Sequence, residues 1–247
     1  MSIFWDNQSE VPQFVHNFCK QHQTELVLVN SSEIPFCLKF CNETLAMDGE
    51  LFREQKMSPL LFDFEKLMTY HKRQNYKLSK QPIIRSVGRP KEGLTVIDGS
   101  FGSGSDSFLL ISLGHTVMSF ERNPYIYLLA SDGLSKLSQE VPLKINFGSF
   151  QESVHREKIE ALEKKVLFFD PMFIAPAHKK NKPKAKKEMQ IFKMVVGPDE
   201  DQQEILKNSL AQFEKVVVKR PLRAEKLLLP VSDSVEGKSI RYDIYLR

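Results

Sequence analysis

Three carboxylates of this chain stand directly after short apolar segments, where they could bind a polar ligand. They are Asp98 after residues 94–97 (LTVI), Glu121 after residues 116–120 (TVMSF) and Asp170 after residues 166–169 (VLFF). If these segments are strands of an open α/β sheet, their carboxyl ends lie at the edge where such sheets bind ligands. A carboxylate after the second strand is the usual acceptor for ribose hydroxyls. We therefore expect one crevice that binds an adenosyl group.

A glycine-rich segment begins at the first of these carboxylates. Residues 98–106 read DGSFGSGSD and precede the apolar residues 108–111 (FLLI). Gly102 and Gly104 allow a tight turn in which the backbone can approach a ligand. The dinucleotide-binding fingerprint would place a third glycine where this chain has Ser107, and no Gly-Lys-Ser/Thr follows as in a P-loop. The segment predicts a nucleotide-type loop whose ligand is not a dinucleotide pyrophosphate.

Residues 170–173 (DPMF) suggest the chemistry. This Asp-Pro-x-Phe segment is similar to the catalytic loop of S-adenosylmethionine (SAM)-dependent methyltransferases that modify exocyclic amino groups of nucleobases. An aromatic amine is a weak nucleophile, and the Asp170 carboxylate and the Pro171 carbonyl could accept its N–H groups. Phe173 could stack on the base. The alternative is a strand that ends at a proline with Phe173 in the core, but the glycine loop and Glu121 favour catalysis.

Several further motifs resemble one family. Together with the segments above, the chain resembles the bacterial RsmJ family, the 16S rRNA guanine-N2 methyltransferases, from about residue 60 onward. The resemblance is carried by residues 121–124 (ERNP), 170–173 (DPMF), 186–189 (KKEM), 196–199 (VGPD), 216–221 (VVVKRP) and 241–245 (RYDIY). It implies a Rossmann-like class I methyltransferase with a mostly parallel seven-stranded sheet. It also implies methyl transfer from SAM to a guanine N2 of 16S rRNA, with free 16S rRNA or the 30S subunit as partner.

The resemblance also implies site residues. Asp170, Pro171 and Phe173 would be catalytic. The cofactor would be bound by Ser105, Asp106, Glu121, Arg122, Gly148, Ser149 and Asp170. The strand-end and glycine-turn patterns described above add Asp98, Gly102 and Gly104 to the cofactor-binding residues. The family commonly carries Arg where this chain has Ser105, so we expect backbone contacts there. No metal is expected, because His16, Cys19 and His22 have helical spacing without an evident fourth ligand.

A run of lysines follows the DPMF segment. The expected RNA-binding residues are Lys179, Lys180, Lys182, Lys184, Lys186 and Lys187, extended by Lys219 and Arg220. A solvated charged segment is the alternative, but a basic loop beside a base-binding pocket could contact phosphates. The net charge of +4 agrees with either possibility.

Length and composition agree with an ordinary soluble enzyme. The chain has 247 residues, 41% of them hydrophobic and 27% charged, enough for a full core. No apolar stretch of about 20 residues is present, and the first residues lack the pattern of a signal peptide. Three cysteines fit a reducing compartment, with Cys37 and Cys41 expected to be buried. We expect a cytoplasmic protein.

The pattern of elements predicts three regions. Residues 1–70 would form the small N-terminal α/β subdomain, 71–93 a basic connector and 94–247 the methyltransferase domain. In the first region we expect a helix over 11–22 and strands at 26–29, 35–40 and 60–64. Beyond residue 94 we expect strands at 94–97, 116–120, 143–147, 166–169, 215–218 and 240–246, with helices from 106, after 124, over 151–163 and from 199. This alternation predicts a mostly parallel sheet with helices on both faces.

Three other functions remain open from the residues alone. A non-catalytic RNA-binding protein could retain this fold. A nicotinamide-dependent oxidoreductase would need the third glycine that Ser107 replaces. An amino-methyltransferase acting on DNA or another RNA would share the chemistry and differ in substrate.

Overall fold

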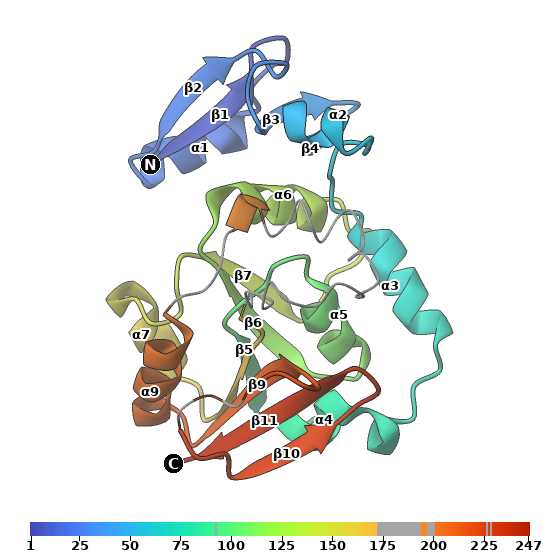
Figure 1. The fold of residues 1–247 in the computed structure, drawn as a ribbon, viewed down its shortest axis with the longest axis vertical. Helices are drawn as coiled ribbons and strands as arrows, with labels where there is room; N and C mark the ends of the chain where they lie inside the picture. The colour runs from blue at the N-terminus through green and yellow to red at the C-terminus, as the bar shows by residue number, and fades with distance from the viewer. Residues whose placement is uncertain (92, 172–193, 197–200, 226, 228) are drawn as a thin grey trace. The chain divides into compact units, whose positions relative to one another are not determined.

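The computed structural model describes residues 1–91, 93–171, 194–196, 201–225, 227 and 229–247. Its contacts divide the chain into two compact units. Within the described residues, unit 1 holds 1–64, 123–138 and 194–196, and unit 2 holds the remainder. Figure 1 labels the elements of both. These units are defined by contacts and do not test the expected division into residues 1–70, 71–93 and 94–247. That division stays a proposal.

Unit 1 contains a four-stranded sheet of order β2-β1-β3-β4. β1 is parallel to β2 and β3, whereas β3 and β4 form an antiparallel hairpin. Asn42 and Glu43 join the hairpin with φ of 50° and 59°, as a two-residue turn of this hand requires. The elements of this unit are β1 (Ser2–Asp6), α1 (Gln13–Gln21), β2 (Glu25–Val29), β3 (Cys37–Cys41), β4 (Thr44–Asp48), α2 (Glu50–Glu54) and α6 (Pro124–Ser135).

Several expectations for the first region are confirmed and others are wrong. The helix and the strands near residues 26 and 37 are present, whereas the sequence pattern missed β1 and β4. No strand spans 60–64: Leu60 makes a single bridge with Met47, and α3 begins at Phe64. Cys37 is buried, but Cys41 is exposed because it ends β3 at the hairpin turn.

Helix α6 is fixed at its start and along its length within unit 1. The Asn123 side chain accepts hydrogen bonds from the N–H groups of Tyr125 and Ile126 at 3.0 and 3.2 Å, which satisfies two donors at the helix start. The Tyr125 hydroxyl accepts from the Phe4 N–H at 2.9 Å, and Asp132 accepts from the Leu45 N–H at 3.0 Å. These bonds tie α6 to β1 and β4.

Unit 2 is built on a seven-stranded sheet of order β10-β11-β9-β8-β5-β6-β7. The strands run parallel except β11, which is antiparallel to β9 and β10, so the expected mostly parallel sheet is confirmed. The strands are β5 (Leu94–Asp98), β6 (Thr116–Glu121), β7 (Leu143–Phe147), β8 (Lys164–Phe169), β9 (Lys215–Pro221), β10 (Asp233–Glu236) and β11 (Ile240–Leu246). The helices are α3 (Phe64–Arg73), η1 (Leu78–Lys80), α4 (Pro82–Val87), α5 (Ser105–Ser112), α7 (Ser153–Glu160) and α9 (Gln202–Gln212).

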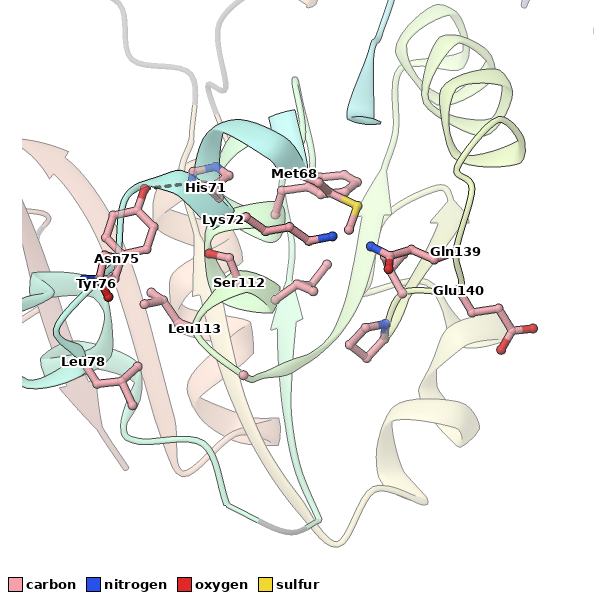
Figure 2. Close-up of a pocket in the computed structure, with 15 residues that line it drawn as sticks. Met68, His71, Lys72, Asn75, Tyr76, Leu78, Ser112, Leu113, Gln139 and Glu140 are labelled. Atoms are coloured by element: carbon pink, nitrogen blue, oxygen red, sulfur yellow. Dashed lines mark hydrogen bonds between the residues drawn. The ribbon is translucent and has the colours of Figure 1, made fainter. Parts of the chain in front are cut away.

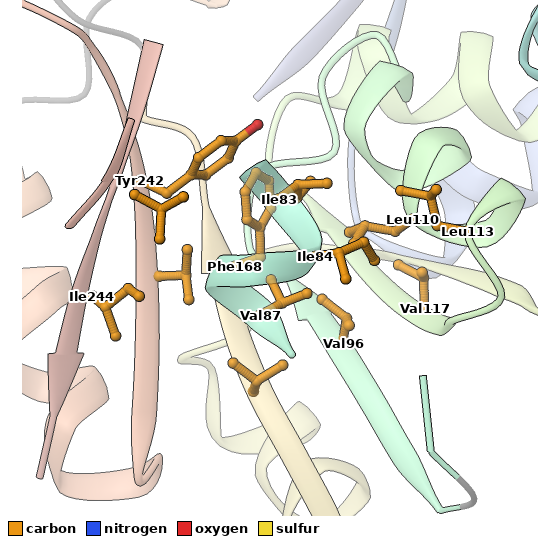
Figure 3. Packing of buried hydrophobic residues seen from close by; sticks show 13 residues of the cluster. Ile83, Ile84, Val87, Val96, Leu110, Leu113, Val117, Phe168, Tyr242 and Ile244 are labelled. Atoms are coloured by element: carbon orange, nitrogen blue, oxygen red, sulfur yellow. The ribbon is translucent and has the colours of Figure 1, made fainter. Parts of the chain in front are cut away.

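Alternating residues of the central strands fill two cores on opposite faces of this sheet. Val217 of β9 packs in one core, and its neighbours Val216 and Val218 pack in the other. Helices α4 and α5 cover the first core, whose side chains are drawn in Figure 3. Helices α7 and α9 cover the second, on the other side of the sheet in Figure 1. Burial on both faces explains why these strands read as unbroken apolar runs.

Within the part of the chain that the structure describes, no helix has the length and apolar character needed to cross a membrane.

Candidate active site

The three predicted carboxylates lie at one edge of the large sheet. Strands β8, β5 and β6 are neighbours and run parallel, so their carboxyl ends meet side by side. Asp98 ends β5, Glu121 ends β6 and Asp170 follows β8. The geometry therefore brings together the residues that the sequence pattern singled out.

Asp98 is the most deeply buried of the three and belongs to a network of hydroxyl groups. Its side chain accepts hydrogen bonds from the Ser107 hydroxyl at 2.5 Å and from the Ser100 N–H at 3.0 Å. The Ser107 and Ser119 hydroxyls lie 2.7 Å apart, and both residues are fully buried. Burial raises the pKa of Asp98 to about 7, although these hydrogen bonds oppose the rise. Ser107, which stands where the dinucleotide-binding fingerprint has its third glycine, is thus a hydrogen-bond donor to Asp98.

The loop after β5 is tied to the neighbouring strand ends. The Gly99 N–H donates to the Phe168 carbonyl at 2.9 Å, and a Cβ at Gly99 would lie 2.7 Å from the Phe150 ring. The Ser100 hydroxyl accepts from the Asp170 N–H at 2.7 Å. Sequence reasoning missed Gly99 and Ser100, although both lie within the glycine loop. These contacts hold the loop against the carboxyl end of β8.

Gly102 and Gly104 have the backbone conformation that the sequence predicts for a tight turn. Their φ angles are +56° and +75°, in a region of backbone conformation that residues with a Cβ rarely adopt. The Gly102 N–H donates to Glu121 Oε2 at 3.0 Å, and α5 begins at Ser105. The turn therefore places the N-terminus of α5 beside the carboxylate of β6.

Gly148 and Ser149 form the next loop along the same edge. The Gly148 N–H donates to the Glu121 carbonyl at 2.9 Å, and the Ser149 N–H donates to Glu152 Oε1 at 2.6 Å. Gly148 has φ +105°, and a Cβ there would lie 2.7 Å from the Glu152 carboxylate. Only glycine fits this position without displacement of Glu152.

Lys219 joins two of the carboxylates. Its Nζ donates to Asp106 Oδ2 at 2.7 Å and to Asp170 Oδ2 at 2.9 Å. Burial raises the pKa of Asp170 to about 6, and the Lys219 ammonium limits the rise. Burial alone would lower the pKa of Lys219, but the two carboxylates outweigh it and raise that pKa above its usual value. Asp98, Asp106, Asp170 and Lys219, which we term the carboxylate cluster, hold more acids than bases.

The structure does not support the expected RNA-binding role of Lys219 and Arg220. The Lys219 ammonium donates to the carboxylates of Asp106 and Asp170. Arg220 is 6% exposed, and its guanidinium donates to Gln202 Oε1 at 3.2 Å and to the Glu225 carbonyl at 2.5 Å. Both cations are engaged by groups of the protein, and their contact with RNA stays a prediction.

The other predicted residues are placed as follows. Arg122 lies at the end of β6 and pairs with Asp201 Oδ2 at 2.9 Å. Pro171 is buried directly after Asp170. Phe173 and the lysines at 179, 180, 182, 184, 186 and 187 lie outside the described residues.

A cavity of about 640 Å³ lies elsewhere in unit 2. It is bounded by α3, the second half of α5 and the loop before β7 (Figure 2). Met68, Lys72 and Gln139 line it, together with other residues of those segments. No predicted site residue lines it, so we do not assign it to the cofactor. Within the described residues, no group of three or more His, Cys, Asp or Glu could hold a metal ion.

Comparison with known proteins decides the family. Residues 20–247 match the family described as SAM-dependent methyltransferase. The ribosomal RNA small subunit methyltransferase J of Bdellovibrio bacteriovorus is 34% identical over 81% of this chain and 79% of its own length. The protein of that name from Coxiella burnetii is 35% identical over 92% and 89%. The chain belongs to the ribosomal RNA small subunit methyltransferase J family.

Membership of the methyltransferase J family makes the chain a SAM-dependent methyltransferase. A solved structure supports the fold: a SAM-dependent methyltransferase from Neisseria gonorrhoeae, 27% identical, superposes with a TM-score of 0.66 over 100% of this chain and 96% of that chain. The expected Rossmann-like fold and the cofactor are thereby confirmed.

The residues at the sheet edge fit SAM. The carboxylate cluster carries more acids than bases, which favours a cationic group such as a sulfonium. Glu121 ends β6, where ribose hydroxyls are usually accepted. Gly102 and Gly104 carry no side chain, so the backbone of the turn is open to close approach by a ligand. The donor and acceptor set thus matches an adenosyl group with a positive charge.

Proposed function

We propose that this protein transfers a methyl group from SAM to the exocyclic N2 of a guanine in 16S rRNA of the small ribosomal subunit. The observation that carries the proposal is the position of Asp170 at the end of β8, held by Ser100 and Lys219 beside the glycine loop. The printed names of the relatives supply the substrate class.

The cofactor would be held by residues at three strand ends. We assign Asp98, Gly102, Gly104, Ser105 and Asp106 to the first loop, Glu121 and Arg122 to the second, and Gly148 and Ser149 to the third, with Asp170 after β8. When bound, SAM supplies a methyl group already activated by the sulfonium charge. The residues of the chain then have to position the acceptor and exclude water.

The acceptor amine would meet Asp170 and Pro171. The Asp170 carboxylate and the Pro171 carbonyl can each accept one N–H of an amino group, which localises the nitrogen lone pair. Phe173 is proposed to stack on the guanine. Because the amino group of a paired guanine already donates one N–H to cytosine, the base would have to be splayed out before Asp170 and Pro171 could accept both N–H groups.

Contacts to the RNA backbone are assigned to the lysines of residues 179–187. Such contacts add affinity that weakens with salt but carry no sequence information. The partner is proposed to be 16S rRNA, free or within the 30S subunit, which places the enzyme in the cytoplasm.

Transfer of tritiated methyl tests the proposal. The acceptors are 30S subunits, free 16S rRNA and duplex DNA from a strain that lacks the enzyme, followed by nucleoside analysis. We expect N2-methylguanosine in ribosomal RNA alone. Label in DNA, or SAM binding without label in any of these acceptors, would mean that the assigned substrate is wrong. Absence of SAM binding would indicate a non-catalytic RNA-binding protein.

Substitution of Asp170 tests the site. Asp170→Ala and Asp170→Asn should abolish methyl transfer while the fold is retained, because neither leaves an anionic acceptor for the amine. Asp233→Asn, which removes an exposed carboxylate from β10, is the matched control and should retain activity. Near-normal turnover by folded Asp170 variants would refute this role.

A further inference from the structure

Lys219 lies inside the site although the sequence places it at a strand end. It is the register partner of Tyr242 on β11, and both side chains lie on the face of the sheet that α5 covers. From there its Nζ reaches Asp106 in the first turn of α5 and Asp170 after β8. One ammonium thus joins a helix to a strand end.

The charges around Asp170 show what this ammonium does. Asp106 on α5 and Asp98 on β5 are the carboxylates near Asp170, and both would oppose its ionisation. Tyr242 on β11 also lies near this group, and burial keeps its hydroxyl neutral by raising its pKa. His71 on α3 is buried near Asp106 with a lowered pKa. Lys219 on β9 is the cation paired with Asp170 in the described residues.

We propose that Lys219 is a positioning residue that keeps Asp170 ionised and aimed at the acceptor amine. This proposal rests on the proposed function. The guanine N2 atom gains the methyl carbon as the carbon–sulfur bond of the sulfonium breaks, and one amino proton is lost to ionised Asp170. A neutral carboxyl could not accept that proton. Lys219 therefore sets the lowest pH at which the enzyme works.

A structural ion pair alone would not produce this dependence. A salt bridge that only stabilises the fold changes the free energy of unfolding, whereas a group that tunes Asp170 changes the pH at which the rate falls. Lys219 also holds one carboxylate oxygen at a fixed point, and the Asp170 N–H is fixed by Ser100. The carboxylate is thereby restrained from both ends of the residue.

Three substitutions separate charge, hydrogen bonding and volume. Lys219→Met removes both charge and donor, Lys219→Gln keeps a donor without the charge, and Lys219→Arg keeps the charge. Lys215→Met, four residues earlier on β9, is the matched control because Lys215 lies near Asp233 and not near the site. Thermal unfolding shows whether each variant folds. If Lys219→Met does not fold, Lys219→Gln tests the loss of the charge.

The decisive measurement is the pH profile of single-turnover methyl transfer to the RNA acceptor. We expect the acidic limb to move up by about one pH unit or more in Lys219→Met and Lys219→Gln, equivalent to roughly a tenfold loss of rate below the midpoint. Lys219→Arg should restore most of the rate, and Lys215→Met should match the parent. An unchanged acidic limb in a folded Lys219→Gln would overturn the proposal.

A second readout does not depend on turnover. The ionisation of Asp170 can be followed by NMR of ¹³C-labelled aspartate carboxyls, assigned by the Asp170→Asn variant, with and without S-adenosylhomocysteine. We expect the Asp170 midpoint to rise in Lys219→Gln. If the parent enzyme labels no RNA yet the midpoint moves, the proposed substrate is wrong and the link between Lys219 and Asp170 stands. If the parent labels RNA and the midpoint stays, the role of Lys219 is wrong.

Discussion

The Ser100 hydroxyl accepts a hydrogen bond from the backbone N–H of Asp170 at 2.7 Å, joining the loop after β5 to the end of β8. The bond acts on the backbone, so it fixes where the Asp170 side chain begins. Asp98 in turn accepts from the Ser100 N–H. The loop after β5, which we assign to the cofactor, and Asp170, which we propose to bind the acceptor amine, are therefore held together by hydrogen bonds.

Ser100→Ala should lower the rate of methyl transfer strongly and the free energy of unfolding only slightly. Loss of one hydrogen bond costs about 1 kcal/mol of stability, but misplacement of Asp170 should reduce kcat roughly tenfold. Steady-state kinetics and urea unfolding measure the two effects. Ser103→Ala is the control in the same loop, because the Ser103 hydroxyl contacts that of Ser105 and not Asp170. Equal kcat values for the two variants would contradict the coupling.

Gly148→Ala should weaken SAM binding. The new Cβ would meet the Glu152 carboxylate at 2.7 Å in a backbone of φ +105°, and Glu152 holds the Ser149 N–H. Gly88→Ala is a matched control, since Gly88 has φ +112° with no atom within 4 Å of the added Cβ. Both should lose about 1–3 kcal/mol of stability through backbone strain. Calorimetry should show weaker SAM binding in Gly148→Ala alone.

Asp98→Asn should change how stability depends on pH. Because burial raises the pKa of Asp98 from 3.8 to about 7, the native state binds more protons than the unfolded state between these values. The contribution of Asp98 to the free energy of unfolding therefore falls as pH rises through this range and levels off above it. The Asn variant lacks this loss, so it should gain stability relative to the parent at pH 8 compared with pH 5. If urea unfolding gives the same difference in free energy of unfolding between the parent and the Asn variant at pH 5 and at pH 8, a raised pKa of Asp98 is excluded.

Ser107→Gly, which completes the dinucleotide fingerprint, should destabilise the protein. It removes the donor at 2.5 Å from Asp98 and the partner of the Ser119 hydroxyl, both buried. Leaving such groups unsatisfied costs about 1–3 kcal/mol. Ser112→Gly on the exposed side of α5 controls for the loss of helix propensity. Urea unfolding should separate the two variants, and no nicotinamide cofactor should bind to either.

The central strands were predictable because burial on both faces leaves an apolar run that ends at a carboxylate. Residues 94–98 (LTVID) and 166–170 (VLFFD) have this character. β10 was not predictable, since only Val235 of its four residues is buried. The segment at 60–64 looked like a strand, but after Leu60 pairs with Met47 the chain turns into α3. A hydrophobic run does not reveal whether a partner strand continues beside it.

The site was predictable in its acids and not in its base. Asp98, Glu121 and Asp170 follow from the ends of strands, whereas the sequence pattern predicts Lys219 to be a surface cation beside Arg220. Alternation along β9 holds the missing signal, because Lys219 lies two residues beyond Val217 and shares its face. That face is the one α5 covers, and Asp106 lies in the first turn of α5. Only the fold reveals that this acid faces Lys219.

The order of the last three strands has a consequence for synthesis on the ribosome. β11 is inserted between β9 and β10, although β9 and β10 are both made before it. Until residues 240–246 emerge, the outer edge of β9 has no strand to pair with in the nascent chain. An open strand edge of this kind is a template for wrong pairing. The last strand of the chain therefore completes the large sheet from an interior position, and a nascent chain that stalls before residue 240 leaves the outer edge of β9 exposed.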